Sequence, residues 1–451
     1  MGEIRSARHD AVLTDEPGAV LTASAPTARP SGPVKGAWRG VAAAMFAIAW
    51  GGNEFTPLLV MYKERGLSVT TVDLLLFDYV LGIVPALLIG GPLSDRYGRR
   101  RLLRPAPLVG AAGSLLLACG SGSVALLSVG RVLCGIALGL AMAVGSSWLK
   151  ELSQPPYGPG SAAGTGARRS AMSLTAGFAL GAGLAGVLAQ WAPWPDSLAY
   201  LINVALCLVA AVWVSRAPET LAPQRNPNRL LADLKVPAAG HRRFLGVAVP
   251  VAVWLFASAA TAYAVLPALL ASTVQGAPIA FSALITVITL GCGFAIQSVA
   301  RRIDRPGTAR AAVVALGLVG AGMATATWAS ASLALWATVV AAVVLGAGYG
   351  IGLVAGLQEI ERIARPDDLA GLTAVFYSVS YLGFGLPALL AFLHQAAGFG
   401  YPGMYVGITL LVLACLALVG RNYRDSGQKH AGMTRQSMPE RRGLRTSSRT
   451  R

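Results

Sequence analysis

Apolar runs with almost no charge recur between residues 38 and 420, and they limit what this chain can fold into more than any other feature. A run of about 18 or more such residues is long enough to cross a hydrocarbon core of about 30 Å as a helix. Only 13% of the 451 residues are charged, whereas soluble domains carry about 25%. The sequence therefore predicts a polytopic membrane protein of the all-α class.

Twelve membrane spans are predicted from these runs. They cover residues 38–62, 71–91, 103–121, 124–148, 169–191, 197–215, 243–271, 277–299, 309–328, 331–357, 369–394 and 401–420. Only the sequence GSGS, at residues 120–123, separates the third span from the fourth. The polar segments 1–35 and 421–451 are interpreted as cytoplasmic tails without a packed structure. No cleavable signal peptide is expected, because the first apolar run is too long for one.

Basic residues are distributed unevenly between the loops. One alternate set of loops, together with the two tails, holds 34 of the 37 lysines and arginines. Because cytoplasmic loops carry such an excess, this pattern predicts cytoplasmic termini in a multi-pass protein of the inner or plasma membrane. The net charge of +17 is thus interpreted as an orientation signal with some attraction to an anionic lipid bilayer, and nucleic acid is not expected as a partner.

The chain contains two related halves. Short similar segments recur 208 to 210 residues apart, and they pair Pro57 with Pro267, Asp95 with Asp304, and Glu151 with Glu359. Three offsets in one register indicate two parallel six-helix bundles. The predicted domains are a bundle at 36–215, a cytoplasmic linker at 216–242 and a second bundle at 243–420.

A charged segment between the second and third spans indicates a family. Residues 91–103 read GPLSDRYGRRRLL, which resembles the signature that the major facilitator superfamily carries between its second and third helices. The resemblance extends over about residues 38–420. It implies a transporter of two six-helix bundles that works by alternating access, with a monomer as the default state.

The resemblance also implies a cytoplasmic gate, built from an Asp–Arg–Glu cluster in the first half and a partial copy in the second. Its predicted members are Gly91, Asp95, Arg96, Gly98, Arg99, Arg100, Glu151, Asp304, Arg305 and Glu359. The glycines permit a tight turn and a close helix approach, and Asp95 can pair with the basic cluster or with a helix N-terminus. The alternative is that these arginines only fix the topology.

Three ionisable residues lie well inside the predicted spans, where a charge is costly. Glu54, Asp78 and Arg131 fall in spans one, two and four, and a rise of about 1.5 Å per residue sets all three in the outer third of the membrane. We expect Glu54 to carry a proton, with Arg131 as its partner and Asp78 as a third member, because an acid beside an arginine is charged only while the two are paired. Arg131, with Gly135 after it, also resembles a family motif of proton-coupled members. A static salt bridge and direct binding of a charged substrate are the alternatives.

Span five contains a run of glycines. Residues 176–186 read AGFALGAGLAG, which is similar to the fifth-helix motif of the family's antiporters. Ala182 stands where that motif has a proline, which weakens the antiporter interpretation. Small residues four apart also allow close helix packing by themselves. After span six, APET at residues 217–220 resembles a short segment common at this place in the family.

Helices that line the cavity in this family carry aromatic, soft or amide side chains in this chain. The predicted substrate-cavity residues are Trp50, Asn53, Met142, Trp254, Tyr263, Phe376, Tyr377 and Tyr381. Such a lining suits a small amphipathic molecule, although a single aromatic can instead face lipid or pack in the core. The predicted function is proton-coupled export of a drug or natural product. Uptake of a sugar, organic acid or similar nutrient, by symport or uniport, is the first alternative, and a receptor or scaffold is the second.

Neither an enzyme nor a bound cofactor is predicted. The sequence has no G-x-x-x-x-G-K-[ST] loop of the kind that cradles ATP phosphates. No His, Cys and Asp cluster has the spacing of a metal site. All five cysteines lie inside apolar runs and are interpreted as small buried hydrophobes.

Overall fold

The computed structural model describes residues 36–158, 164–221, 236–305, 308–365 and 368–436, with side chains on the last helix described as far as Arg421. Regular structure within these ranges is entirely helical, so the predicted all-α fold class is confirmed. The amino-terminal half comprises α1 (Trp38–Asn53), α2 (Phe55–Glu64), α3 (Val69–Tyr97), α4 (Arg99–Leu103), α5 (Ala106–Cys119), α6 (Val124–Leu140), α7 (Ser146–Leu152), α8 (Thr165–Trp191) and α9 (Leu198–Ser215). The carboxy-terminal half comprises α11 (Val249–Ala260), α12 (Leu266–Leu270), α13 (Pro278–Ala295), α14 (Gln297–Ile303), α15 (Arg310–Ser332), α16 (Leu335–Ile363), α17 (Leu369–Tyr381), α18 (Gly385–Ala397) and α19 (Tyr401–Gln436).

Eleven helices in the described ranges are long and apolar enough to cross a membrane. The first predicted span makes the twelfth, and it is split into α1 and α2 at Glu54. Pro57 explains the break, because proline has no N–H to donate to the carbonyl of Asn53 four residues earlier. Short π-helical turns also interrupt two spans, at η1 (Ala141–Gly145) and η4 (Thr261–Val265).

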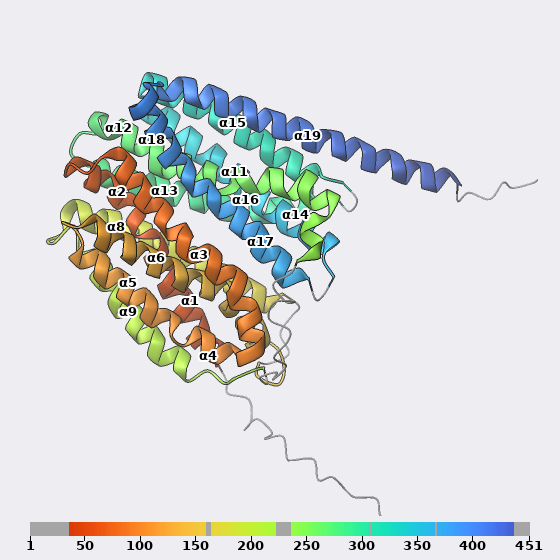
Figure 1. Cartoon of the computed structure of the whole chain (residues 1–451), viewed down its shortest axis with the longest axis horizontal. Coiled ribbons are helices and arrows are strands. Elements are labelled where there is room, and N and C mark those ends of the chain that lie inside the picture. Colours follow the sequence, from red (N-terminus) through yellow and green to blue (C-terminus); the bar gives the residue numbers. More distant parts are fainter. Residues whose placement is uncertain (1–35, 159–163, 222–235, 306–307, 366–367, 437–451) are drawn as a thin grey trace, which may run out of the picture.

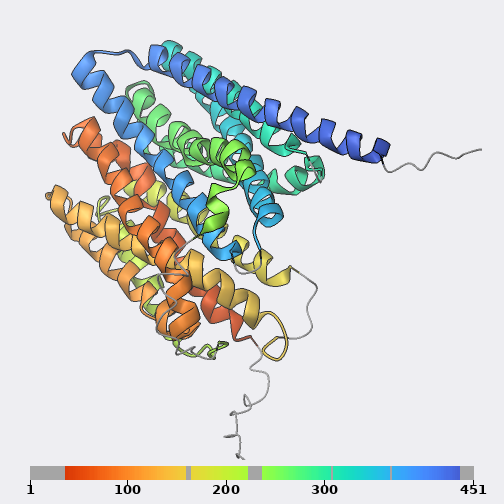
Figure 2. The ribbon, with the colours of Figure 1, turned by 45° about the vertical axis from the view of Figure 1, so that its right-hand side comes forward.

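The two halves lie side by side and touch unevenly (Figures 1 and 2). We call the end of the bundle with residues 96–104, 216–221 and 236–243 the inner end, and the end with residues 65–68, 192–197, 274–277 and 398–400 the outer end. Near the outer end, α8 packs on α13 and α3 packs on α18. Toward the inner end the ribbons of the two halves diverge (Figure 1).

Hydrogen bonds between the halves gather at the outer end. The carboxamide oxygen of Gln190 on α8 accepts from the backbone N–H of Ile279 (3.0 Å) and of Ala280 (3.2 Å), and its Nε2 donates to the carbonyl of Gly276 (3.3 Å). Separately, Thr70 donates to the side chain of Gln395 at 2.8 Å. At the inner end no hydrogen bond or ion pair joins the halves within the described ranges. The structure is therefore closed at the outer end.

Glycines of α8 allow this close packing. A Cβ on Gly186 would lie 2.2 Å from the Cβ of Ala283 across the seam, and a Cβ on Gly177 would lie 2.4 Å from the carbonyl oxygen of Phe46 on α1. Both distances are far below van der Waals contact, so only glycine fits at these positions. The glycine run predicted in span five thus brings α8 close to both α1 and α13.

Several helices extend past the predicted spans at the inner end, such as α3 to Tyr97 and α16 to Ile363. Hydropathy marks the apolar part of a helix, whereas the backbone hydrogen-bond ladder continues into polar residues. For the same reason α19 continues to Gln436 through a proline-free stretch, so the prediction of a tail without structure is wrong for residues 421–436. The predicted tail at 1–35, most of the linker (222–235) and residues 437–451 lie outside the described ranges.

Candidate functional site

Glu54 lies at the break between α1 and α2, with a side chain that is 0% exposed. Its Oε1 atom is 3.0 Å from the hydroxyl oxygen of Ser114 on α5. The same hydroxyl oxygen is 2.8 Å from the Oδ1 atom of Asn203 on α9, whose Nδ2 donates to the carbonyl of Ala47 at 2.7 Å. Glu54 Oε2 has no hydrogen-bond partner among the described residues. The carboxyl group thus sits in a closed polar pocket formed by three helices.

Arg131 on α6 is also 0% exposed, but its partners are unusual for a buried guanidinium. The guanidinium carbon lies 4.2 Å from the centre of the Tyr79 ring and 4.6 Å from that of Phe55. Arg131 also donates to the carbonyls of Leu75 (3.3 Å) and Gly52 (3.4 Å). It forms no ion pair with a carboxylate in the described part of the chain. Cation–π contacts of about 2 kcal/mol or more when desolvated replace the missing partner in this conformation.

Asp78 lies apart from these two groups. It accepts a hydrogen bond from Ser128 on α6 at 2.5 Å. Leu74 and Leu81, which are 47% and 55% exposed, flank it on the surface of α3. The structure therefore brings Glu54 and Arg131 to the same helix break but directs Asp78 to another face of α3.

Three residues of this pocket were not identified from the sequence, namely Ser114, Asn203 and Tyr79. Ser114 and Asn203 are isolated polar residues within the third and sixth spans, and that isolation is the signal that could have indicated them. A second missed pair lies nearer the outer end. Lys63 on α2 donates to Asp73 on α3 at 2.7 Å, and their side chains are only 13% and 3% exposed.

At the inner end, Arg99 forms the centre of the amino-terminal part of the predicted gate. It pairs with Asp95 at 2.5 Å and with Glu151 at 3.1 Å. Glu219, within the APET segment, accepts from the backbone N–H of Arg99 (3.0 Å) and of Arg100 (2.9 Å). A carboxylate at the N-terminus of α4 is favourable because the N–H groups there have no partners within the helix.

The carboxy-terminal half has a matching cluster. Glu359 pairs with Arg362 at 2.6 Å and also with Arg243, while Arg362 pairs with Asp304. The hydrogen bond from Arg243 to Glu359 raises the pKa of that guanidinium, so it is firmly charged. Arg243 and Arg362 were not among the predicted gate residues, although they lie beside the predicted Asp304 and Glu359.

The remaining predicted gate residues contribute less. Arg100 donates to the carbonyl of Ser215 at 2.8 Å, and Arg96 lies over the ring of Tyr97 at 5.4 Å. No side-chain partner of Arg305 is found in the described ranges. Gly98 has a φ of 95°, as the predicted tight turn requires, whereas a Cβ on Gly91 would meet nothing within 4 Å. Each of the two clusters is complete within its own half, and the two do not touch in this conformation.

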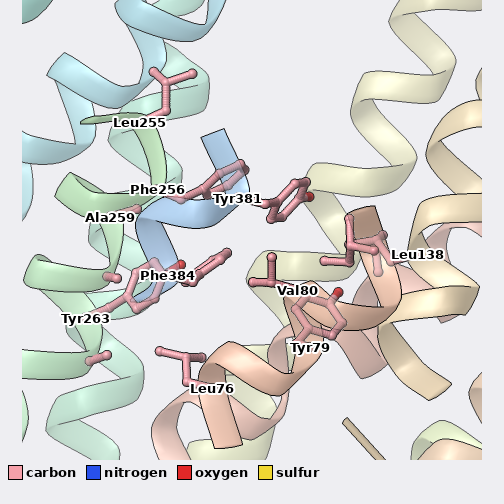
Figure 3. Close-up of a cluster of buried hydrophobic side chains, with 14 of the residues drawn as sticks. Leu76, Tyr79, Val80, Leu138, Leu255, Phe256, Ala259, Tyr263, Tyr381 and Phe384 are labelled. Atoms are coloured by element: carbon pink, nitrogen blue, oxygen red, sulfur yellow. The ribbon is translucent and has the colours of Figure 1, made fainter. Parts of the chain in front are cut away.

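Aromatic side chains lie at the seam between the halves. Figure 3 shows Tyr381 and Phe384 directed toward Tyr79 across the seam. Phe256 stacks on Tyr381, with ring centres 4.3 Å apart, and on Phe384, at 5.0 Å. Tyr381 also donates to the sulfur of Met142 at 3.2 Å, which links the halves.

The predicted cavity residues divide into two groups. Met142, Tyr263 and Tyr381 lie at the seam, together with Phe256 and Phe384, which were not among the predicted cavity residues. The others are engaged elsewhere. Trp254 donates to the sulfur of Cys415 on α19 (3.3 Å), and Asn53 bonds Thr56 and the Phe178 carbonyl. Phe376 packs on Gly356, and Tyr377 packs edge-on against Phe376. Trp50 is buried, with its indole N–H facing Glu54. Aromatic residues that share one helix face, such as Phe256 and Tyr263 seven positions apart, were the available signal.

Metal ligands do not gather in this site. Within the described ranges, no group of three or more His, Cys, Asp or Glu side chains could hold a metal ion. The chemistry available is therefore that of a buried acid, a buried arginine, hydroxyl and amide groups, and aromatic faces.

Residues 40–386 match the family model described as Major Facilitator Superfamily. The glucose transporter GlcP of Staphylococcus epidermidis is 28% identical over 179 residues, which are 40% of this chain and 39% of that protein. Solute carrier family 2, facilitated glucose transporter member 10, of Homo sapiens is 37% identical over 98 residues, which are 22% of this chain and 18% of that protein. The chain thus aligns with less than half of the length of either relative.

Solved structures of transporters share the fold. A peptide transporter POT in complex with sulfate superposes with a TM-score of 0.65 at 17% identity, covering 86% of this chain and 95% of that one. A D-xylose-proton symporter superposes with a TM-score of 0.62 at 17% identity, covering 84% of this chain and 96% of that one. At these identities the likeness is one of fold alone.

Proposed function

Since the chain belongs to the major facilitator superfamily and is a secondary transporter embedded in a membrane, we propose that it exports a small amphipathic molecule in exchange for protons, with Glu54 as the proton carrier. The observation that carries this proposal is the pocket at the break between α1 and α2. A fully buried carboxyl group and a fully buried guanidinium both lie beside that break without forming an ion pair.

Coupling of alternating access to protons needs a group whose charge differs between the two states. A carboxylate near Arg131 is favoured when the two can pair, and a neutral acid is favoured when they are apart. Arg131 contacts α1 and α3 through the carbonyls of Gly52 and Leu75. Glu54 and Arg131 belong to the same half, so a shift of the α1–α2 break or of α3 against α6 that accompanies opening would change the distance between acid and guanidinium. Proton binding can therefore be coupled to opening and closing through this one pair.

The aromatic seam supports the choice of substrate class. Tyr79, Phe256, Tyr381 and Phe384 bring flat apolar rings and phenolic hydroxyls to the seam between the halves. The hydroxyl of Tyr79 is buried and has no hydrogen-bond partner among the described residues. Such a lining favours a molecule with an apolar or aromatic part and a few polar groups over a strongly charged one.

Purified protein in sealed vesicles with an entrapped pH dye tests the proposal. Chloramphenicol serves as a neutral aromatic probe, added outside at zero pH gradient. Exchange for protons predicts that the interior becomes more alkaline as the probe enters, and that Glu54→Gln abolishes this signal. Glu64→Gln, an exposed carboxylate on the same span, is the matched control and should behave as wild type. A proton signal that persists in Glu54→Gln would remove Glu54 from the mechanism.

Uptake of a sugar together with protons is the second candidate, and the similarity to GlcP favours it. The same vesicles separate the two functions by the sign of one signal. If D-glucose or D-xylose enters with protons, the vesicle interior becomes more acidic rather than more alkaline. Proton movement driven by either probe would exclude a receptor or scaffold.

A further inference from the structure

We infer that Glu54 is protonated in this outer-closed conformation, and that Ser114 and Asn203 are positioning residues that favour the protonated form. This inference rests on the proposed role of Glu54 as proton carrier. The protonation of Glu54 is inferred from the hydroxyl group of Ser114, which has a single hydrogen atom and two oxygen neighbours.

The orientation of the Asn203 amide is fixed by its other partner. Its Nδ2 atom lies 2.7 Å from the carbonyl oxygen of Ala47. A reversed amide would set two oxygens at that distance, with no hydrogen between them. The thiol of Cys207 also donates toward Oδ1, at 3.6 Å. Oδ1 therefore faces Ser114, and it can only accept.

Ser114 has one hydrogen to give to two oxygens. Its Oγ atom lies 2.8 Å from Asn203 Oδ1 and 3.0 Å from Glu54 Oε1. If Glu54 were a carboxylate, both neighbours would be acceptors, and one of these short contacts would have no hydrogen in it. Both contacts are satisfied when Ser114 donates to Asn203 and the Glu54 carboxyl O–H donates to Ser114.

The surroundings of Glu54 agree with a neutral acid. The indole N–H of Trp50 faces the carboxyl group, but neither this N–H nor Oε2 of Glu54 has a partner at hydrogen-bond geometry among the described residues, which would leave a buried carboxylate under-satisfied. Arg131, the cation that would neutralise a carboxylate, is instead held by two rings and two carbonyls. A charged Glu54 would compete with those contacts for the guanidinium.

The other titratable groups that face Glu54 cannot substitute for it. They are Arg131 and Cys134 from α6, Tyr62 from α2, Tyr79 from α3, and Tyr200 and Cys207 from α9. The hydroxyls of Tyr62 and Tyr200 bond to each other at 3.0 Å. No second carboxyl group is in this set within the described ranges. A protonated carboxyl in this pocket is therefore Glu54 itself.

Asn203 acts by occupying the only hydrogen of Ser114. While Ser114 donates to Asn203, it offers Glu54 a lone pair, which suits a carboxylic acid and not a carboxylate. Without Oδ1, the hydroxyl would be free to donate to the Glu54 carboxylate, and a hydrogen bond to the charged form favours that form. Asn203→Leu should therefore make Glu54 release its proton at a lower pH.

Infrared difference spectroscopy of the full-length protein in lipid vesicles tests this, because a protonated carboxyl group has its own carbonyl band. We expect wild type to show such a band at neutral pH and Glu54→Gln to lack it. Asn203→Leu should lower the pH midpoint of the band by about one unit, a tenfold change in proton affinity. In a Ser114→Ala background, Asn203→Leu should cause no such shift, because the hydrogen that it frees is gone. Ser282→Ala, a buried serine of the other half, is the matched control.

The outcomes separate this inference from the proposed function. The absence of an acid band assignable to Glu54 at neutral pH overturns the inference, and this measurement needs no Asn203 variant to fold. An equal shift with and without the Ser114 hydroxyl overturns the positioning role. In both cases, loss of proton movement in Glu54→Gln vesicles would still leave Glu54 as the carrier. Retained proton movement in those vesicles would instead refute the proposed function.

Discussion

Gln190 provides the sharpest test of how the outer end is held closed. This residue of α8 makes three hydrogen bonds across the seam, accepting from Ile279 and Ala280 and donating to Gly276. The two N–H groups belong to the first turn of α13, where the helix supplies no acceptor of its own. Gln190→Leu keeps the size of the side chain but removes all three bonds.

The expected effect follows from the three bonds. A hydrogen bond between uncharged groups contributes a net of about 0.5–1.5 kcal/mol, and the bonds of a partly exposed side chain such as Gln190 contribute toward the lower part of that range. Together they favour the outer-closed state by about 2 kcal/mol. Their loss should shift the balance between closed and open outer ends by about 30-fold. Gln190→Glu, which keeps the acceptor but loses the donor, should shift it less.

Spin labels can report this balance. Trp194 and Phe399, which are 68% and 56% exposed, lie in outer-end loops of opposite halves and can each be changed to a labelled cysteine in a background without native cysteines. We expect the Gln190→Leu distance distribution to gain a longer component. Gln297→Leu, which changes a half-buried glutamine on α14 away from the seam, should leave the distribution unchanged. Unaltered distances in Gln190→Leu would refute the view that these bonds hold the outer end closed.

Three further predictions concern stability. Gly350→Ala should lower the melting temperature and reduce the free energy of unfolding by about 2 kcal/mol, because the new Cβ would lie 2.0 Å from a backbone oxygen of α13. Gly317→Ala is the control and should leave the melting temperature unchanged, because a Cβ there meets nothing within 4 Å. Asp73→Asn should lower the free energy of unfolding by about 3 kcal/mol, measured by thermal unfolding, because it leaves the Lys63 ammonium without its carboxylate. Adding Lys63→Met should recover part of that loss, and equal effects of the single and double variants would contradict this. Glu219→Gln should accelerate hydrogen exchange at the first amides of α4 about fivefold, by weakening the cap on that turn; unchanged exchange would exclude the capping role.

The membrane spans were largely predictable because hydropathy depends on local composition. The turn at residues 120–123 and the start of α17 at Leu369 lie where the apolar runs predicted them. The inner ends of α3 and α16 were predicted too short, since polar residues such as Asp95 and Glu359 remain helical beyond the apolar part.

Residue counts predict one shared level for Glu54, Asp78 and Arg131, but they do not predict the direction in which each side chain points. Whether a side chain faces a given neighbour depends on how each helix is rotated about its axis. Asp78 and Tyr79 are adjacent in sequence, yet one bonds Ser128 and the other contacts Arg131.

The amino-acid sequence by itself determined the class of fold, the order of the spans, the twofold repeat and the charged groups that a membrane would make costly. Those properties follow from composition and spacing along one chain. Only the tertiary structure decided that Ser114 and Asn203 meet Glu54, that two aromatic rings hold Arg131, and that Glu219 caps α4. The hydrogen bonds among these contacts join residues 60 to 156 positions apart, and their geometry is set by helix packing, which no local pattern of residues encodes.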